Sequence, residues 1–339
     1  MLIFDVSTKP MKPFYPLTFE PIFKERIWGG TKLKDYLNKP ISSEITGESW
    51  ELSTVPESIS VVNNGELKGK NLNELIDLYP KEILGKEVFN QFGKQFPLLF
   101  KYLDAKTDLS IQLHPNDELA KARHNSFGKT EMWYVMQADE NARLIVGFKE
   151  NSSKEAYLQK LESNDILSLL NEIPVKKGDV FLLETGTIHA IGAGIVIAEI
   201  QQTSDITYRI YDWDRVDANG NKRELHTELA IDAINYKTTA AKKEYTATEN
   251  KRTSIVDCPY FKTNIIPLNG EISINKNDDS FMVLMCTEGS FEMHLNDEKY
   301  MYQTGDTVLI PAVLTSFMLR GKTTLLEITV LATNARIIT

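Results

Sequence analysis

Short apolar segments of strand type, separated by Gly, Asn and Asp, recur along most of this 339-residue chain. They include EMWYVMQA, ARLIVGF, GDVFLLE, IVIAEIQQ, ITYRIYDWD and DTVLIPA. Many short strands with few helices are typical of a β-sandwich or a β-barrel. The chain is therefore expected to be mainly β.

Two parts of the chain repeat one β-type pattern. In the first part, Gly178 is followed by five residues and then by ETGTIH, which ends at His189. In the second part, Gly305 is followed by five residues and then by PAVLTS, which ends at Ser316. Both copies place Gly-Asp at a tight turn, where glycine tolerates the backbone angle. Two similar β-units in tandem account for the pattern, and chance agreement of two turn-linked strand pairs is the alternative.

Three stretches have the apolar spacing of helices and interrupt the β pattern. The first is interpreted as two short helices separated at Pro80. The second opens with a capping side chain at Ser153, and the third opens at Thr227, whose hydroxyl also suits a cap. These stretches span residues 71–93, 153–173 and 226–236. The polar segment that follows, KTTAAKKEYTATENKRT, is interpreted as a linker between two β-domains.

The charge of the chain limits its partners. A net charge of −9 argues against general nucleic-acid binding, which requires a basic surface. A small anionic substrate remains compatible with this charge, because a few local Lys and Arg residues are enough to bind a phosphate.

The cysteines and apolar segments predict a cytoplasmic protein that does not associate with membranes. Cys258 and Cys286 are the only cysteines and do not form a close metal-type pair, so a reducing compartment is expected. The N-terminal apolar stretch is too short, and an acid follows it too early, for a signal peptide. The most apolar region, VFLLETGTIHAIGAGIVIAEI, contains two glutamates and a histidine, which excludes a membrane helix.

The segment SIQLHPND places polar side chains inside a strand pattern. Gln112 and His114 are two residues apart, so they project from the same face of a strand that Pro115 ends. They form either a polar outer face or a pair of ligands directed into a pocket.

The repeat adds two further candidates. Aligning EMWYVM with SFMVLM pairs Glu131 with Ser280, and the glycine spacing pairs His189 with Ser316. In the first copy, two imidazoles, a carboxylate and an amide suit zinc or another divalent first-row metal. A single strand histidine is more often hydrogen-bonded or exposed than a ligand, and Glu131 alone could be a solvated glutamate. Spacing by itself leaves both interpretations open.

Several motifs in a fixed order carry a resemblance to a known family. SIQLHPND, GKTEMWYV, GDVFLLETGTIHAIG and QQTSDITYRIYDWDR resemble type I mannose-6-phosphate isomerase (phosphomannose isomerase) in its short bacterial form. WGG, GESWELS and RELHTELAIDAI fit the same family, and the match runs from about residue 17 to the C-terminus. The resemblance implies a cytoplasmic enzyme that interconverts mannose 6-phosphate and fructose 6-phosphate through a cis-enediol.

The family's fold implies two cupin-like jelly-roll β-barrels in tandem with helical insertions. The resemblance also implies one zinc ion per chain, with another divalent first-row metal as the alternative. The implied metal ligands are Gln112, His114, Glu131 and His189. The expected domains are an N-terminal extension at 1–16, a catalytic metal-binding cupin domain at 17–236, a linker at 237–253 and a metal-free cupin-like domain at 254–339.

Four further residues are candidates for catalysis or substrate binding, and Arg209, Glu199 and Ser110 among them match positions of the family. Arg209 matches its catalytic arginine and suits holding phosphate or enediolate oxygens, because arginine stays protonated. Lys129 shares strand parity with Glu131 and could donate to a sugar oxygen, move protons or bind phosphate. Glu199 is a candidate base or proton relay, or else a partner of a ligand or of Arg209. Ser110 could contact the substrate phosphate, or have no function.

Other functions remain open from the sequence. The chain could isomerise a different hexose phosphate, bind a sugar without catalysis, or be a metal-dependent dioxygenase on the same scaffold, since fold alone does not separate these activities. The expected partners are small sugar phosphates, with no nucleic acid or membrane, and the expected assembly is a monomer or weak homodimer.

Overall fold

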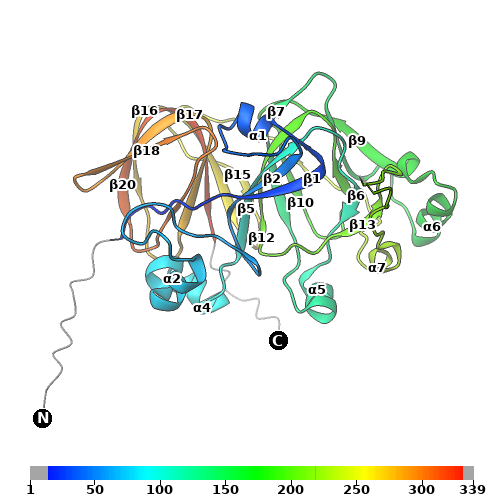
Figure 1. The fold of residues 1–339 in the computed structure, drawn as a ribbon, viewed down its shortest axis with the longest axis horizontal. Coiled ribbons are helices and arrows are strands. Elements are labelled where there is room, and N and C mark those ends of the chain that lie inside the picture. The colour runs from blue at the N-terminus through cyan, green and yellow to red at the C-terminus, as the bar shows by residue number, and fades with distance from the viewer. Residues whose placement is uncertain (1–13, 218, 331–339) are drawn as a thin grey trace, which may run out of the picture.

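The computed structural model describes residues 14–217 and 219–330 and is mainly β, as the sequence predicts (Figure 1). The extension expected at 1–16 lies mostly outside the described residues. Among the described residues, no helix has both the length and the apolar character needed to span a membrane.

Two sheets make up the first unit. One has the strand order β1 (Ile22–Gly30), β2 (Thr46–Leu52), β5 (Leu98–Ala105), β12 (Ile195–Gln202), β7 (Glu131–Ala138), β10 (Val180–Leu183) and β14 (Lys242–Lys243). The other has the order β13 (Tyr208–Tyr211), β6 (Ile111–Leu113), β11 (His189–Ile191), β8 (Arg143–Phe148) and β9 (Leu170–Pro174). A common apolar core joins them, with Leu103 and Trp133 from the first sheet and Val146 and Ile191 from the second.

A six-stranded sheet forms the second unit. Its order is β15 (Thr253–Asp257), β16 (Lys262–Asn275), β20 (Ser316–Thr329), β17 (Met282–Leu295) and β18 (Glu298–Gln303), with β19 (Thr307–Ile310) paired to β17. The three longest strands, β16, β17 and β20, surround a core of their own that includes Ile266, Leu284 and Phe291.

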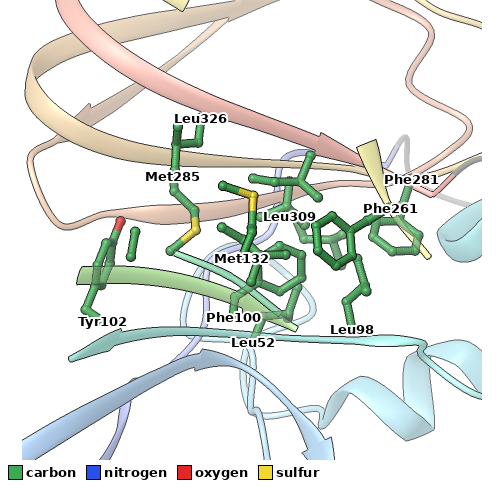
Figure 2. Close-up of a cluster of buried hydrophobic side chains, with 14 of the residues drawn as sticks. Leu52, Leu98, Phe100, Tyr102, Met132, Phe261, Phe281, Met285, Leu309 and Leu326 are labelled. Carbon is green, nitrogen blue, oxygen red and sulfur yellow. The ribbon is translucent and has the colours of Figure 1, made fainter. Parts of the chain in front are cut away.

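The two units share a third apolar core. In β7, Trp133 and Val135 belong to the core of the first unit, whereas Met132 and Tyr134 belong to the shared core. Figure 2 shows Met132 in this shared core with Phe281 and other side chains of the second unit. Strands buried on both faces read as continuous apolar runs, so the alternation that separates their two faces is hidden in the sequence.

The helices are short and lie outside the sheets. They are α1 (Lys32–Asp35), α2 (Leu72–Leu78), α3 (Pro80–Leu84), α4 (Lys86–Phe92), α5 (Asp117–His124), α6 (Lys154–Glu162), the 3₁₀ turn η1 (Ile166–Leu169) and α7 (Thr227–Ile231). The strand pair β3 (Thr54–Val55) and β4 (Ser58–Ile59) completes the elements.

The structure corrects the predicted helices in detail. The stretch at 71–93 forms three helices rather than two, because Gly85, with φ +96°, breaks it a second time. Ser153 caps α6 as predicted, but the helix ends at Glu162 and the rest of the stretch is η1 and β9. Thr227 is the first residue of α7 and not its cap. The apolar end of the 153–173 stretch forms a strand because it pairs with β8, and this tertiary contact overrides helix propensity.

The segment interpreted as a linker packs against the first unit. Its residues Lys242 and Lys243 form β14, which pairs with β10. The hydroxyl of Tyr245 donates to the carbonyl of Gly178 at 2.7 Å. At the other end of the chain, Leu17 exchanges backbone hydrogen bonds with Leu309 of β19. The segment at 237–253 is therefore part of the first unit, and Leu17 ties the start of the described chain to the second unit.

The strand pairing confirms the repeat and shifts its register. Gly178 N donates to Val135 O, and in the second unit Gly305 N donates to Cys286 O. Counting back from these equivalent bonds, Glu131 pairs with Leu183, five residues after Gly178, and Met282 pairs with Ile310, five after Gly305. Met282, not Ser280, is therefore the counterpart of Glu131. The alignment from sequence was wrong by two residues, because both registers preserve the alternation of apolar residues.

Candidate metal centre and active site

A cavity of about 510 Å³ opens between the two sheets of the first unit. Five of the eight residues predicted from sequence line it, and the other three contact members of those five. The lining residues are Gln112, Lys129, His189, Glu199 and Arg209, and the contacting ones are Ser110, His114 and Glu131. The fold thus brings together all the predicted site residues.

Three buried side chains form a cluster that could hold a metal ion. Ligand atoms of His114, Glu131 and His189 all lie within 4.8 Å of one another. Nε2 of His114 lies 3.5 Å from Oε2 of Glu131, and Nε2 of His189 lies 3.5 Å from Oε1. Glu131 comes from β7 of the larger sheet, whereas the histidines come from the end of β6 and the start of β11. The two sheets must therefore close on each other to build the cluster.

Backbone carbonyls set the tautomer of both histidines. Nδ1 of His114 donates to Ile206 O at 2.8 Å, and Nδ1 of His189 donates to Thr187 O at 2.9 Å. Each ring therefore presents an unprotonated Nε2 to Glu131. Metal-binding histidines are usually oriented through the second ring nitrogen in this way.

The donor atoms of the cluster fit a cation. Among the described residues, Oε1 of Glu131 and Nε2 of His189 are buried without a hydrogen-bond partner. Burial raises the pKa of Glu131 to about 7 and lowers the pKa of His189 to about 4. Burial, followed by the charge of Lys129, lowers the pKa of His114 well below its usual value. Neutral imidazoles are the metal-binding form, and a divalent cation would compensate the buried carboxylate.

Gln112 occupies the position beside His189. The two residues are direct partners in the β6–β11 ladder, so their side chains leave the same face of the sheet. Ser110 Oγ donates to Oε1 of Gln112 at 3.2 Å, which orients the amide at the cavity wall. The predicted amide ligand is therefore placed next to the His–Glu–His cluster.

Lys129 lies against the cluster, as strand parity predicts. Its Nζ is 3.0 Å from Oε2 of Glu131 and 3.2 Å from Nε2 of His114. Burial opposes its charge, but the carboxylates of Glu131 and Glu199 outweigh that effect and raise the pKa of Lys129. Lys129 is therefore a buried, protonated donor at the cavity wall.

Glu199 has both carboxylate oxygens engaged. Oε1 accepts from Lys101 Nζ at 3.0 Å, and Oε2 accepts from Trp133 Nε1 at 3.0 Å. These three residues lie side by side across β5, β12 and β7. Burial alone would raise the pKa of Glu199, but Lys101 and Lys129 lower it, so the group is ionised at neutral pH.

The sequence did not identify Lys101 or its second carboxylate partner. Lys101 stands in the apolar strand run PLLFKYLDA, and a lone lysine in a strand buried on both faces is the signal that could have found it. Its Nζ also lies 3.9 Å from Oε2 of Glu48, whose other oxygen, Oε1, accepts from Arg26 Nε at 2.7 Å. Lys101, Glu48 and Arg26 all line the cavity.

Arginines gather at one side of the cavity. Arg209 Nε donates to Ser110 Oγ at 3.3 Å, and its Nη1 donates to Glu224 O at 2.8 Å. Arg209 forms no ion pair among the described residues, whereas Asp212 pairs with Arg223. Burial and then Arg223 lower the pKa of Arg209, which stays cationic at neutral pH. The crowded positive charge favours an anionic group at this side.

Comparison with known proteins gives consistent matches along the chain. The family model for the type I phosphomannose isomerase catalytic domain matches residues 17–144, and that for the mannose-6-phosphate isomerase cupin domain matches residues 251–330. Mannose-6-phosphate isomerase ManA of Bacillus subtilis is 39% identical over 313 residues, which cover 90% of this chain and 96% of that protein. Mannose-6-phosphate isomerase of Streptococcus mutans is 38% identical over 308 residues, covering 90% and 95%.

Solved structures share the whole architecture. The crystal structure of mannose 6-phosphate isomerase from Bacillus subtilis superposes with a TM-score of 0.85 at 37% identity, covering 93% of this chain and 99% of that one. A putative mannosephosphate isomerase from Archaeoglobus fulgidus shares the fold at 23% identity, with a TM-score of 0.75 and coverages of 94% and 99%.

Proposed function

The chain belongs to the type I phosphomannose isomerase family and is an aldose–ketose isomerase, and from this premise we propose how its cavity interconverts mannose 6-phosphate and fructose 6-phosphate. The observation that carries the proposal is the placement of a His–Glu–His cluster and unpaired Arg209 in one cavity. A sugar phosphate requires both a group that polarises its carbonyl end and a cation for its phosphate.

Gln112, His114, Glu131 and His189 are the proposed ligands of one zinc ion per chain. Their two imidazoles, carboxylate and amide form the nitrogen and oxygen donor set that zinc accepts, with another divalent first-row metal as the alternative. Bound there, the metal would supply Lewis-acid stabilisation of charge on the oxygens of the substrate. The buried unpartnered atoms of Glu131 and His189 support this assignment.

Arg209 is proposed to hold the phosphate or the enediolate oxygens, with Ser110 orienting its guanidinium. Arg26 and Arg223 line the same cavity and add positive charge. Several fixed cations favour an anionic substrate over a neutral one, because charge-assisted hydrogen bonds are about twice as strong as neutral ones. This arrangement supports a phosphorylated hexose as substrate.

Isomerisation moves a proton between C2 and C1 through a cis-enediol. Glu199 is the proposed base or proton relay, since its lowered pKa leaves it ionised and able to accept a proton. Lys129 is protonated and is proposed to donate to a sugar oxygen as negative charge develops. Lys101 is a positioning residue that holds Glu199 in place.

A coupled assay of mannose 6-phosphate conversion tests the function and its metal dependence together. Chelation should abolish activity, and added zinc should restore it. Glu131→Gln should lower activity by more than about 100-fold and reduce bound metal, since loss of even an outer partner of a ligand costs about 10- to 100-fold. Glu184→Gln, at an exposed residue that follows β10, is the matched control and should retain activity. Full activity in chelated protein would contradict the metal assignment, and inactivity of folded, metal-replete protein would contradict the isomerase.

A cytoplasmic location and a monomer or weak homodimer complete the proposal. Cys258 and Cys286 are both free thiols in the structure, which supports a reducing compartment. Light scattering across a range of protein concentrations measures the assembly.

A further inference from the structure

The second unit holds a cavity of its own. It measures about 600 Å³, similar to the 510 Å³ of the first, and is lined mostly by amides, hydroxyls and cations. Its lining includes Arg252, Asn264, Asn275, Ser280 and Thr329. None of these residues belongs to the site described above.

Strand register places this cavity where the first unit has its catalytic cavity. With Glu131 equivalent to Met282, the ladder partners of each residue across the neighbouring strands also become equivalent. The row Trp50–Lys101–Glu199–Trp133 corresponds to the row Ser254–Asn264–Glu327–Leu284. Even the irregularity after Trp50 in β2 recurs after Ser254 in β15. The equivalence therefore rests on four adjacent strands and not on one motif.

In the second unit, different side chains stand at the positions equivalent to the proposed metal ligands. Gln112 pairs with His189 in the first unit, and Asn275 pairs with Ser316 in the second. By the same count, His114 corresponds to Asn277 and Glu131 to Met282, and both of these counterparts line the second cavity. Amides, a thioether and a hydroxyl are poor ligands for a divalent first-row metal. Amides and hydroxyls do suit the hydroxyl groups of a sugar.

The second unit has a buried carboxylate at the position equivalent to Glu199, although it lacks the proposed metal ligands. Glu327 is the counterpart of Glu199 and is 1% exposed. Its Oε1 accepts from Arg252 Nε and from Asn264 Nδ2, whereas its Oε2 has no partner among the described residues. Asn264 replaces Lys101, and Arg252, directly before β15, supplies the cation instead. The Glu327 carboxylate is fully buried, whereas Arg252 is 37% exposed and lines the cavity, so this ion pair joins the buried carboxylate to the cavity wall.

Cations outnumber carboxylates among the residues that line the cavity, and two of the three cations pair with carboxylates outside the lining, Arg252 with Glu327 and Lys262 with Asp257. Arg252, Lys262 and Lys276 line it, with Asp279 as the one carboxylate in the described lining. Lys276 donates to the carbonyls of Ser280, Ala312 and Asn277 and forms no ion pair among the described residues. We propose that the second unit binds a phosphorylated hexose in this metal-free cavity, with its amides and hydroxyls on the sugar and its cations on the phosphate. The site is separate from the catalytic cavity and does not require isomerase activity.

Mannitol 1-phosphate is a suitable probe because it carries no carbonyl and cannot be isomerised. Calorimetric titration of the full chain should show two molecules bound per chain, and hydrogen exchange should slow in residues 262–282 as well as around the catalytic cavity. Ser254→Trp fills the second cavity from an exposed position and should remove one of the two sites. Ser273→Trp, also exposed on the second unit but outside the lining, should keep both.

The outcomes separate this proposal from the isomerase. Absence of protection in 262–282, or retention of both sites in Ser254→Trp, would overturn the second site. Equally tight binding of mannitol would overturn the assignment of an anionic ligand. A single site that Ser254→Trp removes would support the second site while contradicting sugar-phosphate binding in the catalytic cavity. Asn275→Phe, which fills the same cavity from another strand, replaces Ser254→Trp if that variant fails to fold.

Discussion

At the scale of single residues, hydrogen bonds from outside the His–Glu–His cluster fix the side chains of the proposed catalytic cavity. Thr187 and Ile206 fix the two imidazoles through their carbonyls, and Trp133 fixes Glu199. Backbone carbonyls are suited to this task because the strands and turns that carry them are themselves fixed. Side chains that are oriented before a ligand arrives need little reorganisation during the reaction.

Glu48 connects this cavity to the pH dependence of stability. Burial alone would raise its pKa, but the charges of Lys101 and Arg26 outweigh burial and lower the pKa to about 2, from 4.5 in the unfolded chain. A lowered pKa means that the ionised group stabilises the fold above about pH 4.5, and that this stability is lost as the pH falls towards 2. The stability of the protein should therefore fall across this range in part because of Glu48.

Glu48→Gln should flatten this acid dependence. The variant is expected to be less stable than wild type at pH 7, and the difference should shrink as the pH falls to 3, as measured by urea unfolding. Glu44→Gln, at an exposed position, should leave the wild-type dependence in place. The same pH dependence in Glu48→Gln and wild type would contradict this role of Glu48.

At the scale of elements, the decisive feature is that β5, β7 and β12 are buried on both faces. One face carries Lys101 and Glu199 to the cavity wall and Glu131 to the His–Glu–His cluster, and the other carries Phe100 and Met132 into the core shared with the second unit (Figure 2). The bounds of β7 follow the sequence pattern, since Glu131–Ala138 matches the segment EMWYVMQA. The stretch at 153–173 is only partly helical, because its last four residues pair as a strand with β8.

Phe281→Ala tests how strongly the shared core couples the units. Phe281 is fully buried, and its ring lies 4.7 Å from that of Phe96 in the first unit. The substitution should cost about 3–5 kcal/mol of unfolding free energy, the range for a buried phenylalanine. All four tryptophans lie in the first unit, so tryptophan fluorescence during urea unfolding reports that unit alone.

If the units unfold together, the fluorescence transition of Phe281→Ala should move to lower urea. Met301→Ala, at a side chain that is 67% exposed in the second unit, should change the stability by no more than about 0.5 kcal/mol. An unchanged fluorescence transition in Phe281→Ala would show that the units are independent.

At the scale of the molecule, the second unit packs against one face of the larger sheet through the shared core. The segment at 237–253 adds a strand to the first unit, and Leu17 bonds to β19 of the second unit. We propose that the C-terminal unit stabilises the catalytic one by burying this face. Removal of that unit would expose large apolar side chains to water. This exposure costs about 25 cal/mol of free energy for each Å² of apolar surface.

A chain truncated after Glu249 should therefore be insoluble or unfolded, as measured by circular dichroism and sedimentation of the expressed protein. Co-expression of residues 250–339 as a separate chain is the matched control and should restore some soluble complex. A soluble and fully active first half would contradict the stabilising role.

The sequence by itself predicted the strand-rich class, the tandem units and the shared face of Gln112 and His114, because alternation in a strand decides which residues share a face. The full set of metal ligands followed from the family resemblance and not from spacing. Only the tertiary structure decided which residues meet across strands. The contact between Lys101 and Glu199, and the equivalence of Glu131 with Met282 rather than Ser280, both depend on register. Register is set by turn hydrogen bonds and strand irregularities that join residues far apart in the chain, and a shift of two residues leaves the apolar alternation unchanged.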